Sequence, residues 1–285
     1  MIKLAQQWQV SLNDGSNWDF RSGSSFFYEL ILKPFEAELE KVNPQVLVFI
    51  HDGILRNLPM AALYDGEKFL AQKWANVSSI GLNFTSIAKK QEDFEALVFG
   101  LEDSPAGWLR LENVKQEVTF VRDLLGGEKF LNSQFTVNNL SNQLEENNYS
   151  VVHLATHGYF GGTSETSFIL AYDRKVSAAK LEEILLKSDR VIELLVLSAC
   201  ETAVGNERSL LGLAGIAARS GVASTLGSLW QVQDDQQSET IEGFYTQIKM
   251  NNVNKAIALQ QVQIEKIKNL AHPQQWAALN LIGDW

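Results

Sequence analysis

The stretch VIELLVLSACET, residues 191–202, carries the only cysteine of the chain. Residues 191–197 are almost entirely apolar, a pattern typical of a buried strand. Cys200 and the polar residues after it come where that strand would end. We therefore expect the Cys200 thiol at the rim of a sheet. The alternative is a small buried hydrophobe, the usual state of a lone cysteine.

A second stretch, VVHLATHG at residues 151–158, predicts another buried strand that ends at His157. A thiol becomes a strong nucleophile only as a thiolate, and a nearby imidazole is the usual base. The two strand ends therefore suggest Cys200 as nucleophile and His157 as base. Gly158 would let a substrate carbonyl approach a main-chain N–H group closely. His157 could instead be a polar residue that simply ends a strand.

His153 lies inside the same apolar run, so we expect a hydrogen-bonded core histidine. With His157 it forms an H-x-x-x-H pattern, but a zinc site of that spacing needs a helix and an adjacent glutamate. A single cysteine excludes an internal disulfide and a cysteine-based metal cluster. The sequence also lacks phosphate-binding glycine motifs and a G-x-S-x-G elbow. We expect neither a metal nor a cofactor.

Apolar, β-rich runs alternate with segments of helical spacing along the chain. Strands that are apolar throughout and separated by helices are typical of a mostly parallel sheet covered on both faces. Sites in such sheets form beyond the carboxyl ends of the strands, where His157 and Cys200 stand. The pattern predicts an α/β fold with strands at 46–50, 96–100, 151–156, 191–197, 222–230 and 276–283, and helices at 111–125, 181–185, 210–219, 238–250 and 253–270.

Composition narrows the class of protein. The 285 residues are 45% hydrophobic, enough for a full core, and the formal net charge is -10. A nucleic acid or an anionic membrane rewards a basic face, so we expect neither as a partner. No apolar signal segment or membrane-spanning run is present, and we expect a cytoplasmic protein. Residues 1–24 are expected to be a loose segment before one domain at 25–285.

Two carboxylates follow the predicted strand after Cys200, in WQVQDD at residues 230–235. If that strand neighbours the cysteine strand, Asp234 and Asp235 lie at the same rim. A carboxylate there could pair with an arginine or lysine side chain of a substrate. The alternative is a structural role in the first turn of the helix that follows.

Several of these segments together resemble the CHAT domain, a caspase-like domain related to separase and often fused to tetratricopeptide repeats in bacteria. The resemblance rests on segments that run from Asp52 to the end of the chain and cover the domain from about residue 25. They are DGxLRxLPxAAL at 52–63, ATHG at 155–158, LSACETAxG at 197–205, LWxVxD at 229–234, FY at 244–245, WAA at 276–278 and GDW at 283–285.

The resemblance implies a caspase-like, three-layer α/β/α sandwich and a cysteine endopeptidase. His157 would act as general base and then acid, and Cys200 as nucleophile. Backbone N–H groups at Gly158 and Cys200 would form the oxyanion hole. Asp234, in preference to Asp235, would lie in the pocket for a basic P1 residue. The partners would be a protein or peptide substrate and a regulatory protein; the alternative is a catalytically silent interaction module.

Overall fold

The computed structural model describes residues 1–79, 81, 94–105, 107–159, 166–199 and 220–285. Cys200 and the helix predicted at 210–219 lie outside the described residues.

An eight-stranded sheet forms the centre of the described structure, in the order β1-β2-β11-β10-β9-β5-β3-β4. Every pairing between its described strands is parallel except that of β10 with β11, so the predicted mostly parallel sheet is confirmed. The strands are β1 (Val46–Ile50), β2 (Ala75–Ser79), β3 (Ala96–Gly100), β4 (Gly127–Leu131), β5 (Val151–Thr156), β9 (Leu194–Ala199), β10 (Ser224–Ser228) and β11 (Leu279–Gly283).

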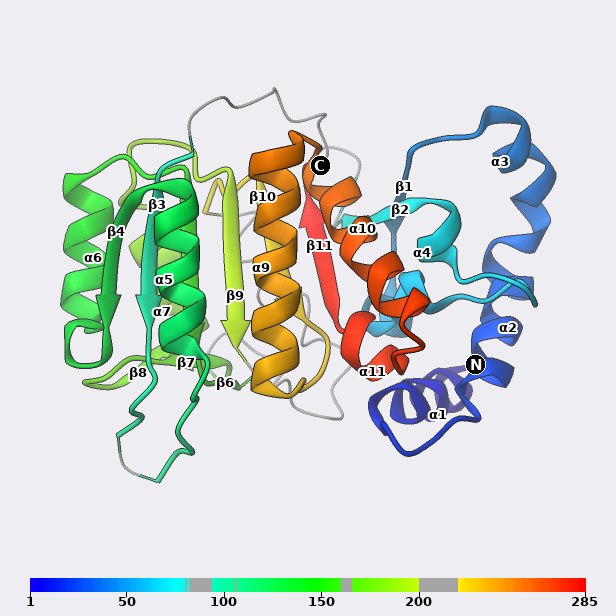
Figure 1. The fold of residues 1–285 in the computed structure, drawn as a ribbon, viewed down its shortest axis with the longest axis horizontal. Helices are drawn as coiled ribbons and strands as arrows, with labels where there is room; N and C mark the ends of the chain where they lie inside the picture. Colours follow the sequence, from blue (N-terminus) through cyan, green and yellow to red (C-terminus); the bar gives the residue numbers. More distant parts are fainter. Residues whose placement is uncertain (80, 82–93, 106, 160–165, 200–219) are drawn as a thin grey trace.

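Helices cover both faces of this sheet, which gives the three expected layers (Figure 1). On one face, α5, α9 and α10 pack on β3, β5, β9, β11 and β2. On the other, leucines of α6 and α7 join a cluster with apolar side chains of β3, β5 and β9. The bounds are α5 (Val114–Leu125), α6 (Val137–Glu146), α7 (Ala178–Leu185), α9 (Asp234–Asn251) and α10 (Lys255–Lys268). In the described part of the chain, no helix has the length and apolarity needed to cross a membrane.

Local sequence explains where several of these helices begin. The side chains of Thr136, Ser177 and Asn254 each accept a hydrogen bond from a backbone N–H in the first turn, which begins α6, α7 and α10. Such caps satisfy N–H groups that have no partner within the helix. Short 3-10 turns connect other elements: η1 (Lys33–Phe35), η2 (Gly53–Asn57), η3 (Met60–Ala62) and η5 (Asn132–Gln134).

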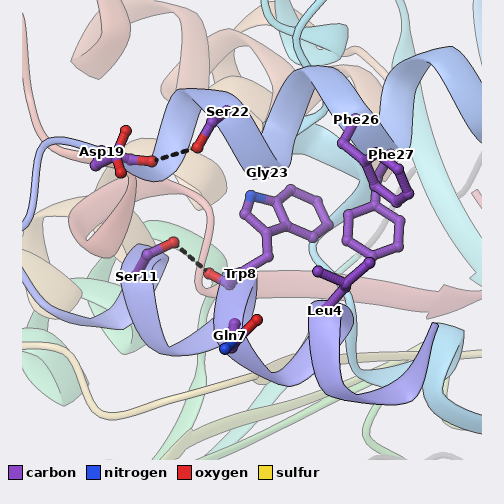
Figure 2. Close-up of a pocket in the computed structure, with 9 residues that line it drawn as sticks. All are labelled: Leu4, Gln7, Trp8, Ser11, Asp19, Ser22, Gly23, Phe26 and Phe27. Atoms are coloured by element: carbon purple, nitrogen blue, oxygen red, sulfur yellow. Dashed lines mark hydrogen bonds between the residues drawn. The ribbon is translucent and has the colours of Figure 1, made fainter.

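The amino-terminal residues, where a loose segment was expected at 1–24, include two helices. Helix α1 (Ile2–Asn13) and helix α2 (Phe20–Ile31) pack together, and Trp8 is 2% exposed. Trp8 lies across Gly23, where an added Cβ would come within 2.5 Å of the indole (Figure 2). Their buried side chains join α4 (Leu70–Lys73), α11 (Pro273–Trp276) and Trp230 in a second core cluster. The domain boundary at residue 25 stays a prediction.

A buried polar network links the sheet to the helices above it. His153 Nε2 lies 2.9 Å from Glu117 Oε1, and His153 Nδ1 lies 3.2 Å from the Tyr245 hydroxyl. All three side chains are at most 2% exposed. Burial, together with the Glu117 carboxylate, raises the pKa of the Tyr245 hydroxyl well above its usual value. The predicted hydrogen-bonded core histidine at position 153 is confirmed.

We predict that His153→Leu lowers the free energy of unfolding by about 3–5 kcal/mol, because it leaves the Glu117 carboxylate buried without its partner. The double variant Glu117→Leu/His153→Leu removes that charge as well. The double variant should therefore lose less free energy of unfolding than the two single variants lose in sum. Urea unfolding of the four proteins measures the coupling, and additive losses would contradict it.

Candidate active site

The candidate site lies at the carboxyl ends of β5 and β9. These strands pair in parallel over six residues, from Val151 opposite Leu194 to Thr156 opposite Ala199. His157 directly follows Thr156, and Ala199 is the last described residue before Cys200. Strand β10 pairs in parallel with β9, so the condition set for Asp234 and Asp235 is met and the chain leaving β10 emerges at the same rim. The register therefore brings the carboxyl ends of β5, β9 and β10 to one edge of the sheet.

The backbone at His157 is fixed by a small second sheet made of β6 (Gly158–Tyr159), β7 (Phe168–Leu170) and β8 (Lys175–Ser177). Leu170 N–H donates to the His157 carbonyl at 2.9 Å, and Thr156 Oγ1 donates to the Leu170 carbonyl at 2.6 Å. Gly158 is buried and pairs with Ile169. In Figure 1 the small sheet lies at the end of the central sheet toward which β9 points. The strand end is thus held from two directions.

The His157 ring has one defined orientation. It is 6% exposed, and its Nε2 lies 2.7 Å from the carbonyl oxygen of Leu109. A carbonyl oxygen can only accept, so Nε2 carries the hydrogen. In the neutral ring Nδ1 then holds the lone pair, and Nδ1 is the nitrogen that can accept a proton. The Trp108 ring covers the imidazole, with centroids 5.0 Å apart.

Ion pairs hold the loop that carries Leu109. Arg110 Nη2 lies 2.7 Å from Glu102 Oε1, and Arg110 Nε lies 3.3 Å from Asp103 Oδ1. The side chain of Asn132 accepts from the backbone N–H groups of Glu102 and Asp103 at 2.9 and 3.0 Å. We call this set the Arg110 clamp. It fixes the residue next to Leu109, and with it the direction of the Leu109 carbonyl.

Asp234 begins α9 and holds the amino-terminal ends of two helices together. Its Oδ2 accepts from the Asn113 backbone N–H at 2.7 Å and from Asn113 Nδ2 at 3.0 Å, and Asn113 precedes α5. The carboxyl is half-buried. Burial raises its pKa above the usual 3.8, although the hydrogen bonds from Asn113 oppose that rise. Asp235 is exposed and accepts from the Gln236 N–H. Asp234 therefore has a structural role in the first turn of α9, which was the alternative to substrate binding.

Sequence reasoning missed Leu109, Trp108 and Arg110. The group that binds His157 is a main-chain carbonyl, which every residue carries, so no residue type could reveal it. Trp108 and Arg110 lie in an irregular loop after β3 whose path depends on tertiary contacts. Among the described residues, no group of three histidine, cysteine, aspartate or glutamate side chains could hold a metal ion.

Comparison with known proteins identifies the family. The family described as CHAT domain matches residues 24–284. No curated protein matches the chain by sequence. The Arg-specific cysteine proteinase gingipain R has a similar structure: the match has 11% identity and a TM-score of 0.57, and covers 99% of this chain and 73% of that one.

Two further structures are similar. A complex of the pro- and mature domains of RgpB from Porphyromonas gingivalis matches at 9% identity and a TM-score of 0.55, covering 99% and 75% of the two chains. The separase–securin complex of Saccharomyces cerevisiae matches 80% of this chain and 15% of that chain, at 13% identity and a TM-score of 0.48. The gingipain matches show the fold of caspase-like cysteine peptidases. With the family match over nearly its whole length, the chain belongs to the CHAT domain family.

Proposed function

We propose that this protein is a cysteine endopeptidase that cleaves protein substrates after a basic residue. The observation that carries the proposal is the β5–β9 register, which sets Thr156 opposite Ala199. These are the residues that immediately precede His157 and Cys200 in the sequence. The defined orientation of the His157 ring adds support, because a general base must present one nitrogen to its partner.

In the proposed reaction, His157 Nδ1 takes the proton of the Cys200 thiol. The thiolate attacks the scissile carbonyl, and the backbone N–H groups of Gly158 and Cys200 stabilise the resulting oxyanion. The imidazolium then protonates the leaving amine, and water hydrolyses the acyl-enzyme by the same route. The Leu109 carbonyl accepts from Nε2–H throughout, so it keeps the ring in place while the charge on it changes.

Asp234 is the proposed recognition group for the basic P1 residue. Its Oδ2 is held by Asn113, and we assign Oδ1 to the substrate cation. Gingipain R is described as Arg-specific, and its fold is shared, which supports a basic preference. Asp235, more exposed and one residue further on, is the second candidate. Regulation by a partner protein, a cytoplasmic location and a bacterial source remain predictions.

Cys200→Ala removes a single sulfur atom, so we expect an unchanged fold and a loss of peptide cleavage on the order of 10⁵-fold or more. His157→Ala should lose activity to a similar degree. Alkylation separates a peptidase from a silent interaction module: Cys200 should react with iodoacetamide at neutral pH, and more slowly when His157 is alanine. Undiminished cleavage by Cys200→Ala would overturn the assignment.

The Arg110 clamp gives a second prediction. Arg110→Gln removes both ion pairs, and we expect kcat to fall about 10-fold or more with little change in KM, because misplacing a reacting group by about 1 Å is costly. The free energy of unfolding should change by less than about 1 kcal/mol, since the ion pairs are partly exposed. Lys180→Gln removes the remote, exposed pair with Glu183 and is the control. Equal losses in the two variants would contradict a positioning role.

Asp234→Asn tests the P1 assignment without breaking the helix contact, because an asparagine oxygen can still accept from Asn113. The raised pKa means that the folded state binds the proton more tightly than the unfolded chain does. Ionisation of this carboxyl therefore lowers the free energy of unfolding once the pH rises above the ordinary pKa of an aspartate. The variant should be at least as stable as the natural protein at pH 7.

Cleavage after arginine by Asp234→Asn should fall about 10- to 100-fold relative to cleavage after a neutral residue, the scale of a lost charged hydrogen bond. Asp235→Asn is the matched control. Peptides that differ only at P1 provide the measurement. An unchanged preference in Asp234→Asn with a loss in Asp235→Asn would move the role to Asp235.

A further inference from the structure

A row of aromatic side chains leads away from the His157 ring. Trp108 covers the imidazole at 5.0 Å and meets Phe168 edge-on at 6.2 Å, and Phe168 lies 5.7 Å from Tyr159, all between ring centroids. The rings come from the loop after β3 and from strands β6 and β7. We call Trp108, Phe168 and Tyr159 the aromatic ledge.

The ledge is open to solvent. Tyr159 is 40% exposed, and Trp108 and Phe168 are partly buried. Leu109, next to Trp108 in the sequence, is 81% exposed, so it presents another apolar side chain to solvent while its carbonyl binds His157. Single exposed apolar residues are ordinary, but contiguous ones mark surfaces that bind something.

The ledge is also pre-formed. Tyr159 pairs with Phe168 across β6 and β7, and Phe168 pairs with Ser177 of β8. The ammonium group of Lys175 lies over the Phe168 ring, 4.2 Å from its centre, and adds a cation–π contact. The Arg110 clamp fixes the loop with Trp108. A rigid apolar surface loses little conformational entropy when a ligand binds.

The position of the ledge indicates what would occupy it. An extended peptide advances about 3.3 Å per residue, and side chains on one face recur about every 7 Å. The ring-to-ring steps from His157 to Trp108 and on to Phe168 are 5.0 and 6.2 Å. A polypeptide whose scissile bond lies at His157 would therefore bring a side chain within about three residues of that bond onto the ledge.

Charge at the ledge favours an apolar side chain over a basic one. Aromatic faces can bind arginine or lysine through cation–π contacts. Here Lys175 already occupies the Phe168 ring and would repel a second cation. The ledge thus differs in chemistry from the carboxylate assigned to the P1 residue.

We propose that the aromatic ledge is a substrate subsite that binds a bulky apolar side chain, aromatic or long aliphatic, within three residues of the scissile bond. This inference rests on the proposed peptidase function. The substrate class is then a polypeptide that combines a basic P1 residue with a nearby apolar one.

The test uses peptides with arginine at P1 and either phenylalanine, leucine or alanine at each of the three flanking positions on both sides. Binding is measured by fluorescence anisotropy on Cys200→Ala, and kcat/KM on the natural protein. One flanking position should favour phenylalanine or leucine over alanine by about 10-fold, the scale of burying a large apolar side chain. Tyr159→Ala should reduce this preference, measured as the ratio of kcat/KM for the phenylalanine peptide to kcat/KM for the all-alanine peptide.

Two variants control for structure. Tyr159→Phe keeps the ring and should keep the preference. Tyr172→Ala removes a tyrosine of matching exposure, 42%, that lies outside the ledge, and it should have no effect. A preference in binding without any cleavage would support the ledge and overturn the peptidase proposal. Cleavage with no apolar preference, or a preference that survives Tyr159→Ala, would overturn the ledge alone.

Discussion

The parallel pairing of β5 with β9 is the constraint on which the candidate site depends. Both strands are buried on both faces, so each side chain along them has a packing partner. A slip of one residue would exchange the two faces and place His153 where Leu154 now packs. The register that keeps the core intact is therefore the register that aligns the two strand ends. Core packing and site geometry are specified by the same apolar side chains.

Two histidines four residues apart have different environments. His153 lies inside the sheet, and both its ring nitrogens bind side chains of helices above it. His157 lies past the strand end, where its ring meets a loop and not a helix face. The partners of His153 tie it to the core of the fold. We propose that His157, just past the end of β5, serves the substrate instead.

Sequence patterns predicted the parts of the fold that depend on long apolar runs. The bounds of β1, β3 and β5 were predicted to the residue, because each run is mainly apolar and a polar residue or glycine marks its end. Strand β4 was missed because its short polar sequence forms a strand only beside β3. Helix α1 was missed because its burial depends on Trp276 and other residues from the far end of the chain. The Leu109 carbonyl has no sequence signature, so only the structure reveals that it binds the His157 ring.

We propose that the Asp234 side chain combines a structural contact with a recognition role. Joining the ends of α5 and α9 requires only an oxygen that accepts from Asn113, and asparagine would supply one without a charge. The carboxylate is half-buried and its pKa is raised, so ionisation at this position costs stability. Groups kept charged at a cost to folding concentrate where charge is used in binding or catalysis. The nearby Glu117 and Asp235 carboxylates increase that cost, since both raise the pKa further. A cation from outside the chain, such as a basic substrate side chain, would remove this cost on binding, which is why we favour a recognition role for Asp234.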